Sequence, residues 1–110
     1  MELEKQVDGQ VAVLRCSGRL NMGAAGRLRG AVDETVADGV NRIVVDLSET
    51  SFVDSSGLGA LVGGLKSARQ AGGDLRIAAA PEQVRTVLAL TNLDRVLTPH
   101  QTVEDASRGW

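Results

Sequence analysis

Residues 42–47, Arg-Ile-Val-Val-Asp-Leu, form a β-branched and almost continuously apolar run. A strand of this composition is covered on both faces, which is typical of a parallel sheet packed between other layers. Apolar residues at helical spacing follow the run, and a second strand-like segment lies over residues 74–79. Parallel strands joined through a helix need a right-handed crossover, so this pattern predicts an α/β fold.

The N-terminal part of the chain predicts a β-hairpin ahead of this unit. Two short strand candidates, residues 3–7 and 11–16, are separated by Asp8-Gly9, a dipeptide typical of tight hairpin turns. After a connecting loop, apolar residues at helical spacing predict an amphipathic helix over residues 24–36. The expected sheet is therefore mixed and mostly parallel, with a hairpin at its N-terminal end and helices packed on it.

The C-terminal half continues the alternation of helices and strands. After a short loop, a second helix begins at residues 54–57 and stops at Gly72-Gly73. Pro81 suits the first turn of a third helix, because its missing amide costs nothing there. All 110 residues are expected to form one domain. The last expected elements are a strand over 74–79, a helix over 81–88, a short strand at Val96-Leu97 and a short helix over 102–108.

The charge and hydropathy of the chain exclude several classes of protein. It has 12 basic and 14 acidic residues and no basic block, so a nucleic-acid-binding surface is not expected. No apolar run approaches the roughly 18 residues of a membrane span. The N-terminal residues also lack the apolar core of a signal peptide. We therefore expect a cytoplasmic protein that has no membrane span.

Residue types that bind metals or react with substrates are scarce. Cys16 is the only cysteine and lies in an apolar strand pattern, so we expect a buried, unreactive thiol. Together with the single histidine, His100, it supplies too few ligands for a metal site. Phe52 and Trp110 are the only aromatic residues, which predicts an aliphatic core. We expect no metal and no cofactor.

The segment Asp54-Ser55-Ser56-Gly57, at the predicted start of the second helix, has two interpretations. In the first, its side-chain oxygens cap the helix by accepting hydrogen bonds from free amides of the first turn, and Gly57 and Gly59 let the helix pack closely. In the second, the helix start and its partial positive charge accommodate a phosphate on an exposed serine. That serine would lie at the carboxyl end of a parallel strand, the usual functional edge of an open α/β sheet.

The longer string Asp54-Ser55-Ser56-Gly57-Leu58-Gly59, after the strand of residues 43–47, resembles the signature of the anti-sigma factor antagonists. These are the stand-alone members of the STAS domain family. Residues 18–21, Gly-Arg-Leu-Asn, resemble the family's segment before the first helix, and residues 72–75, Gly-Gly-Asp-Leu, resemble its entrance to the next strand. The resemblance covers about residues 5–100.

This resemblance implies a fold and a mechanism. The fold is a single STAS domain, and the unphosphorylated protein binds an anti-sigma factor and so frees the sigma factor. The anti-sigma factor is often a serine kinase, and phosphorylation of the first serine, Ser55, abolishes binding until a PP2C-type phosphatase restores it. ATP and magnesium belong to the kinase, so this chain has no catalytic residues and is not an enzyme.

The resemblance also assigns roles to the residues around Ser55. Asp54 is expected to orient the site or contact the partner, Ser56 to cap the helix, and Gly57 to complete the binding segment. Asn21, on the loop facing the phosphorylation site, stands where the family usually has aspartate. Asn21, Asp54, Ser55, Ser56 and Gly57 are therefore the expected partner-binding residues.

Other functions fit parts of the sequence. The same fold serves as a scaffold or ligand-binding module in transporters, lipid handling or signalling assemblies, and the sequence leaves this alternative open. A dinucleotide fingerprint would need a third glycine at position 62, which is Val62. A serine hydrolase would need a base, and His100 is not part of a nucleophile-elbow motif.

Overall fold

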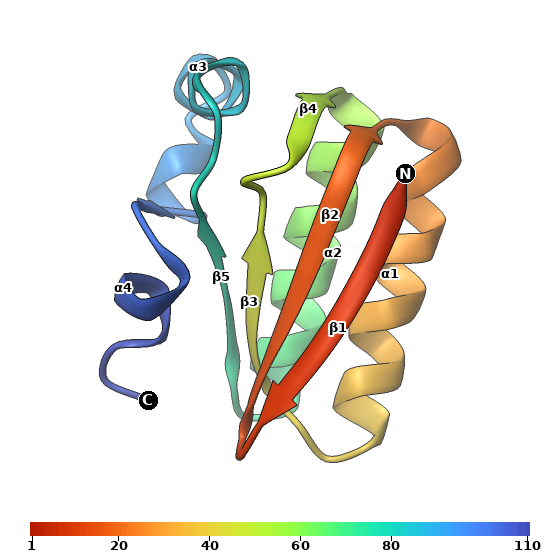
Figure 1. Cartoon of the computed structure of the whole chain (residues 1–110), viewed down its shortest axis with the longest axis vertical. Coiled ribbons are helices and arrows are strands. Elements are labelled where there is room, and N and C mark those ends of the chain that lie inside the picture. The colour runs from red at the N-terminus through yellow and green to blue at the C-terminus, as the bar shows by residue number, and fades with distance from the viewer.

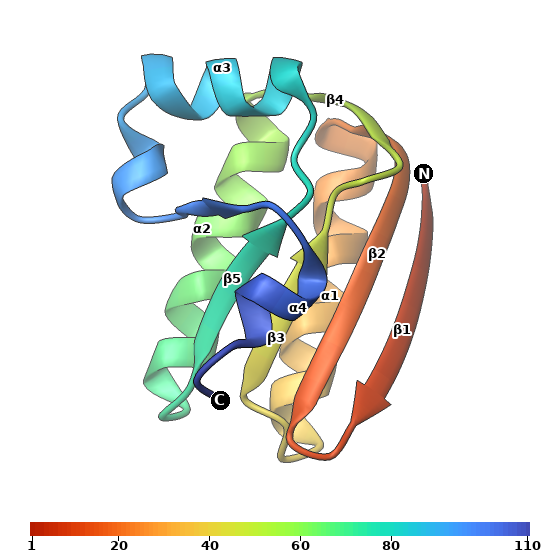
Figure 2. The ribbon, with the colours of Figure 1, turned by 60° about the vertical axis from the view of Figure 1, so that its left-hand side comes forward.

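The computed structural model describes residues 1–110 and shows a mixed sheet with helices on both faces. Helices α1 and α2 lie side by side on one face, and the short helix α4 crosses the other (Figures 1 and 2). The elements are β1 (Glu2–Asp8), β2 (Val11–Leu20), α1 (Met22–Ala37), β3 (Arg42–Asp46), β4 (Thr50–Val53), α2 (Ser55–Gln70), β5 (Asp74–Ala78), α3 (Glu82–Leu90), a 3₁₀ turn (Leu93–Arg95), β6 (Pro99–His100) and α4 (Val103–Ser107).

The sheet is mostly parallel, as predicted. The strand order is β1-β2-β3-β5-β6; β1 and β2 form the antiparallel hairpin, and all other pairs are parallel. Strand β4 pairs with the carboxyl-terminal part of β2. These features confirm the predicted α/β fold with its N-terminal hairpin.

The main core lies between the sheet and helices α1 and α2, and it is aliphatic, as expected. Cys16 is fully buried in it, and burial raises the pKa of the thiol to about 12, with the negative charge of Asp46 adding to the effect. A thiol with this pKa stays protonated near neutral pH and is a poor nucleophile. The prediction that Cys16 is buried is confirmed. None of the helices is both long and apolar enough to cross a membrane.

Strand β2 is longer than predicted and, besides β1, pairs with two parallel strands. Its first part pairs with β3 and its end pairs with β4, with a register shift between Gly18 and Arg19. Gly18 has φ +95°, a conformation that glycine adopts without strain, and this lets the strand change partner. The segment predicted as a loop between residues 47 and 54 therefore contains strand β4, whose Thr50 hydroxyl donates a hydrogen bond to the Cys16 carbonyl at 2.7 Å.

The prediction of a strand at Val96-Leu97 is wrong. Leu97 is buried, but both residues follow the 3₁₀ turn, and their amides donate to the carbonyl of Leu93 at 3.0 and 2.7 Å. The last strand is β6, which pairs with the end of β5. The strand was predicted because two adjacent apolar residues indicated burial at this point. In the structure, their backbone amides form the hydrogen bonds of a turn and not those of a sheet. The C-terminal helix was predicted correctly.

Candidate functional site

Two helices begin next to each other at one edge of the sheet. Strands β2 and β4 are paired in parallel at their ends, Leu20 opposite Val53, and each leads directly into a helix. The residues between strand and helix are Asn21 and Asp54, and the Asp54 amide donates to the Leu20 carbonyl at 3.3 Å. The starts of α1 and α2 therefore lie close together at the ends of β2 and β4 (Figure 1).

Both residues cap the helix that follows. The Asp54 side chain accepts a hydrogen bond from the Gly57 amide at 2.9 Å, and the Asn21 side chain accepts one from the Ala24 amide at 3.3 Å. Asp54 has extended backbone angles, as an N-cap requires, while Ser56 already lies inside α2. The assignment of Ser56 as the cap is therefore wrong, and Asp54 has this role.

Ser55 is the first residue of α2, and its side chain is exposed, whereas Ser56 is half-buried. The first turn of α2 contains no acidic residue, so the Asp54 cap supplies the only carboxylate at this helix start. Free amides and the partial positive charge of a helix N-terminus favour a negative group at such a position. A phosphate on Ser55 is thus compatible with the local structure.

Gly57 makes the closest approach between α2 and the sheet. A Cβ atom at this position would lie 2.2 Å from the Leu20 carbonyl oxygen, a distance that real Cβ atoms do not show. Gly59 has no such neighbour, so the expected packing role applies to Gly57 alone. The absence of a side chain at Gly57 allows Ser55 and Asp54 to sit directly over the end of β2.

Further side chains lie beside Asn21 at this edge. Met22, the first residue of α1, is 77% exposed. The Arg19 guanidinium lies 4.9 Å from the centre of the Phe52 ring, an interaction that needs the unpredicted pairing of β2 with β4. A shallow pocket of about 340 Å³ lies between Arg19, Asn21 and Arg27. The surroundings of Asn21 therefore include an exposed apolar side chain and two cations.

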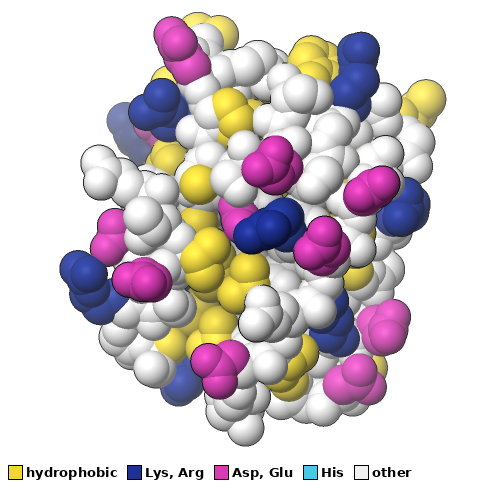
Figure 3. Space-filling model, in the orientation of Figure 1, with side chains coloured by type: hydrophobic (Ala, Val, Ile, Leu, Met, Phe, Trp, Pro, Cys, Tyr) yellow, Lys and Arg dark blue, Asp and Glu magenta, His cyan; other side chains and the backbone are white.

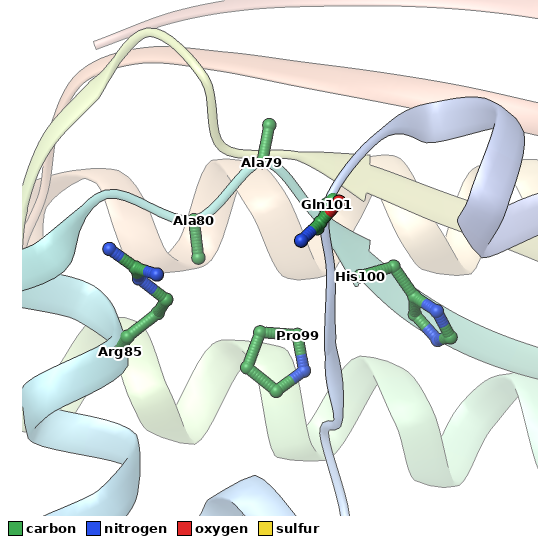
Figure 4. A pocket seen from close by; sticks show the side chains of 6 residues that line it. All are labelled: Ala79, Ala80, Arg85, Pro99, His100 and Gln101. Carbon is green, nitrogen blue, oxygen red and sulfur yellow. The ribbon is translucent and has the colours of Figure 1, made fainter.

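The largest pocket, about 390 Å³, lies elsewhere, between the end of β5, the start of α3 and β6. Figure 4 shows Arg85 and Gln101 on its two sides, while His100 points away from Arg85. None of the predicted site residues lines this pocket. No group of three or more histidine, cysteine or acidic side chains is arranged so that it could hold a metal ion.

Removing the Asp54 cap is expected to destabilise the fold. Asp54→Ala loses the hydrogen bond to the Gly57 amide and should cost about 1 kcal/mol of unfolding free energy. Asp54→Asn keeps an accepting oxygen and should cost clearly less, since asparagine caps helices about as well as aspartate. Urea denaturation of the two variants measures the difference. Equal losses would show that the carboxylate charge, and not the hydrogen bond, stabilises this helix start.

Comparisons with known proteins agree with the fold and with the motif. A protein-family model described as the STAS domain matches residues 2–106. A protein of Thermotoga maritima named as an anti-sigma factor antagonist is 39% identical over 74 residues, which is 67% of this chain and 66% of the relative. The match thus spans slightly less than two thirds of that relative.

Two further similarities cover more of the chain. An anti-sigma-F factor antagonist of Mycobacterium tuberculosis is 31% identical over 101 residues, covering 90% of this chain and 80% of the relative. A crystal structure of a Thermotoga maritima protein titled as an anti-sigma factor antagonist superposes with a TM-score of 0.87 at 33% identity. That superposition covers 94% of this chain and 90% of the other.

Proposed function

The chain belongs to the STAS domain family, and from this premise we propose that it is an anti-sigma factor antagonist controlled by phosphorylation of Ser55. The observation that carries the proposal is the exposed Ser55 at the first position of α2, with Asp54 capping the same helix. The names of the relatives support the class of partner.

In this proposal the unphosphorylated chain binds an anti-sigma factor through the edge formed by Asn21 and residues 54–57. Binding releases the sigma factor for RNA polymerase, and the chain acts as a binding protein, not as an enzyme. Such a protein works beside RNA polymerase, so the proposal also places it in the cytoplasm.

Phosphorylation of Ser55 then acts on binding and leaves the fold in place. A phosphate adds nearly two negative charges at the start of α2, where the helix dipole and free amides favour them. A docked partner instead meets these charges and that of Asp54 together, in an interface that excludes water. Unpaired like charges in such an interface are costly, so the complex dissociates. A PP2C-type phosphatase would reverse the change.

The proposal predicts where a cognate anti-sigma factor kinase places the phosphate. Incubation of the wild-type chain with the kinase, ATP and magnesium should modify Ser55, because it is exposed while Ser56 is half-buried. Phosphopeptide mapping by mass spectrometry identifies the modified residue. Ser55→Ala should prevent modification, and the matched variant Ser56→Ala should leave it intact. A phosphate on Ser56 or elsewhere would contradict the site assignment.

A further inference from the structure

The second face of the sheet carries an apolar groove that none of the residues assigned to the switch lines. Helix α4 covers Val44 and Ala78 with Ala106, and these three are fully buried. The apolar side chains beside them are only partly covered and line a groove of about 340 Å³ between the hairpin and α4. These side chains are Val11, Val13, Val103 and Trp110.

Acidic side chains surround this groove. The register of the hairpin places Asp8 opposite Val11 and Glu4 opposite Arg15, on the sheet face that carries the valines. Asp8 and Glu104 line the groove itself, one from each wall. Figure 3 shows hydrophobic side chains in a hollow on this face, with several acidic side chains and one Lys or Arg side chain around them. The groove thus combines an apolar floor with a negative rim.

The cations near the groove are already engaged, whereas the rim carboxylates are not. Arg15 pairs with the buried Asp46 at 3.3 Å. Arg76 stacks on the Trp110 ring at 4.0 Å and lies 3.6 Å from an Asp74 oxygen. Glu4, Asp8 and Glu104 take part in none of the ion pairs of the structure. The two carboxylates that line the groove, Asp8 and Glu104, therefore have no cation within ion-pair distance.

We propose that this groove is a docking site for a cationic amphipathic segment of a partner protein. The apolar side chains of the segment would pack on Val13, Val103 and Trp110, while its lysines or arginines face the rim. An anionic membrane or a nucleic acid would be repelled by the same carboxylates. None of the residues assigned to the switch lines the groove, so this inference stands apart from the proposed function.

The single tryptophan makes the proposal directly measurable. Trp110 lines the groove and the chain has no tyrosine, so intrinsic fluorescence excited in the tryptophan band reports on this site. An amphipathic helical peptide of leucine and lysine should cause a saturable change in Trp110 emission, which weakens as salt is added. A peptide in which glutamate replaces every lysine should cause no such change. Equal responses to both peptides, or none to either, would overturn the proposal.

Charge reversals on the two walls locate the binding. Asp8→Lys and Glu104→Lys should each weaken binding of the leucine–lysine peptide about three- to tenfold, because each replaces an attraction with a repulsion. Glu34→Lys, an exposed acid on α1 at the other face, is the matched control and should bind like the wild type. Because Asp8 lies on β1, its variant gives the answer even where Glu104→Lys unwinds α4. If Glu34→Lys weakened binding as much as Asp8→Lys, the attraction would be nonspecific and the groove assignment would fail.

Discussion

Ser55→Asp is expected to weaken binding to the anti-sigma factor about 100-fold, the equivalent of roughly 3 kcal/mol. The new carboxylate would stand beside Asp54 on the exposed start of α2, so a docking partner would have to desolvate two neighbouring negative charges. Ser55→Ala adds no charge and should bind about as tightly as the wild type. Titration calorimetry of both variants measures the contrast.

The same substitution should not destabilise the protein. The carboxylate that replaces the Ser55 hydroxyl would lie in the first turn of α2, where negative charge typically gains about 0.3–1 kcal/mol from the helix dipole. Thermal denaturation is therefore expected to show an unchanged or raised midpoint for Ser55→Asp. Gln70→Glu, at the exposed last position of the same helix, adds one negative charge far from the site and should leave binding unchanged. A loss of binding in Gln70→Glu as well would indicate an effect of net charge, not of the switch.

Gly57→Ala is expected to lower the unfolding free energy by about 2 kcal/mol or more, even though alanine is the better helix former. The added methyl group would lie 2.2 Å from the Leu20 carbonyl oxygen and 2.9 Å from its Cγ atom. The Leu20 carbonyl belongs to the backbone and also accepts a hydrogen bond from the Asp54 amide. It therefore cannot move without disturbing the contact between the end of β2 and the start of α2. Chemical denaturation measures the loss.

Gly59→Ala is the matched control for this substitution. Gly59 lies two residues further along α2, is exposed, and would place its methyl group in open space. It should gain about 0.5–1 kcal/mol from better helix propensity. The two variants are therefore expected to change stability in opposite directions. A stabilising effect of Gly57→Ala would contradict the close approach of α2 to Leu20.

The fold could be predicted from the sequence because its strongest signals are local and repeated. The apolar run that became β3, the helical spacing of α1 and α2, and the Asp8-Gly9 signal beside the Gly9-Gln10 turn each specify one element with little help from the others. Their order then leaves few topologies, because parallel crossovers are right-handed. The aliphatic core follows in the same way from the scarcity of aromatic residues.

Strand β4 could not be predicted because its four residues are too few to show an alternating pattern. Its position depends on a partner distant in the sequence, the end of β2, which changes neighbours at Gly18. The contact of Arg19 with Phe52 follows from that pairing and was missed with it. Likewise, three adjacent polar residues can each cap a helix, and only the backbone angles identify Asp54 as the cap.

The position of the candidate site could be predicted more accurately than the roles of the residues within it. Asn21 was expected to face the segment of residues 54–57, and the paired ends of β2 and β4 bring the two helix starts close together. The role of Ser56 was wrong, and the 77% exposure of Met22 was not predicted. Side-chain exposure depends on tertiary packing, which local patterns do not reveal.

Calorimetric titration of the anti-sigma factor with the chain, before and after enzymatic phosphorylation of Ser55, tests the central claim most directly. In the absence of ATP, the unphosphorylated chain should bind saturably, and the phosphorylated chain should give no measurable heat of binding under the same conditions. Circular dichroism of the two forms should remain the same, since the phosphate is expected to act on docking and not on folding. Equal affinity of the two forms for the anti-sigma factor would contradict the account.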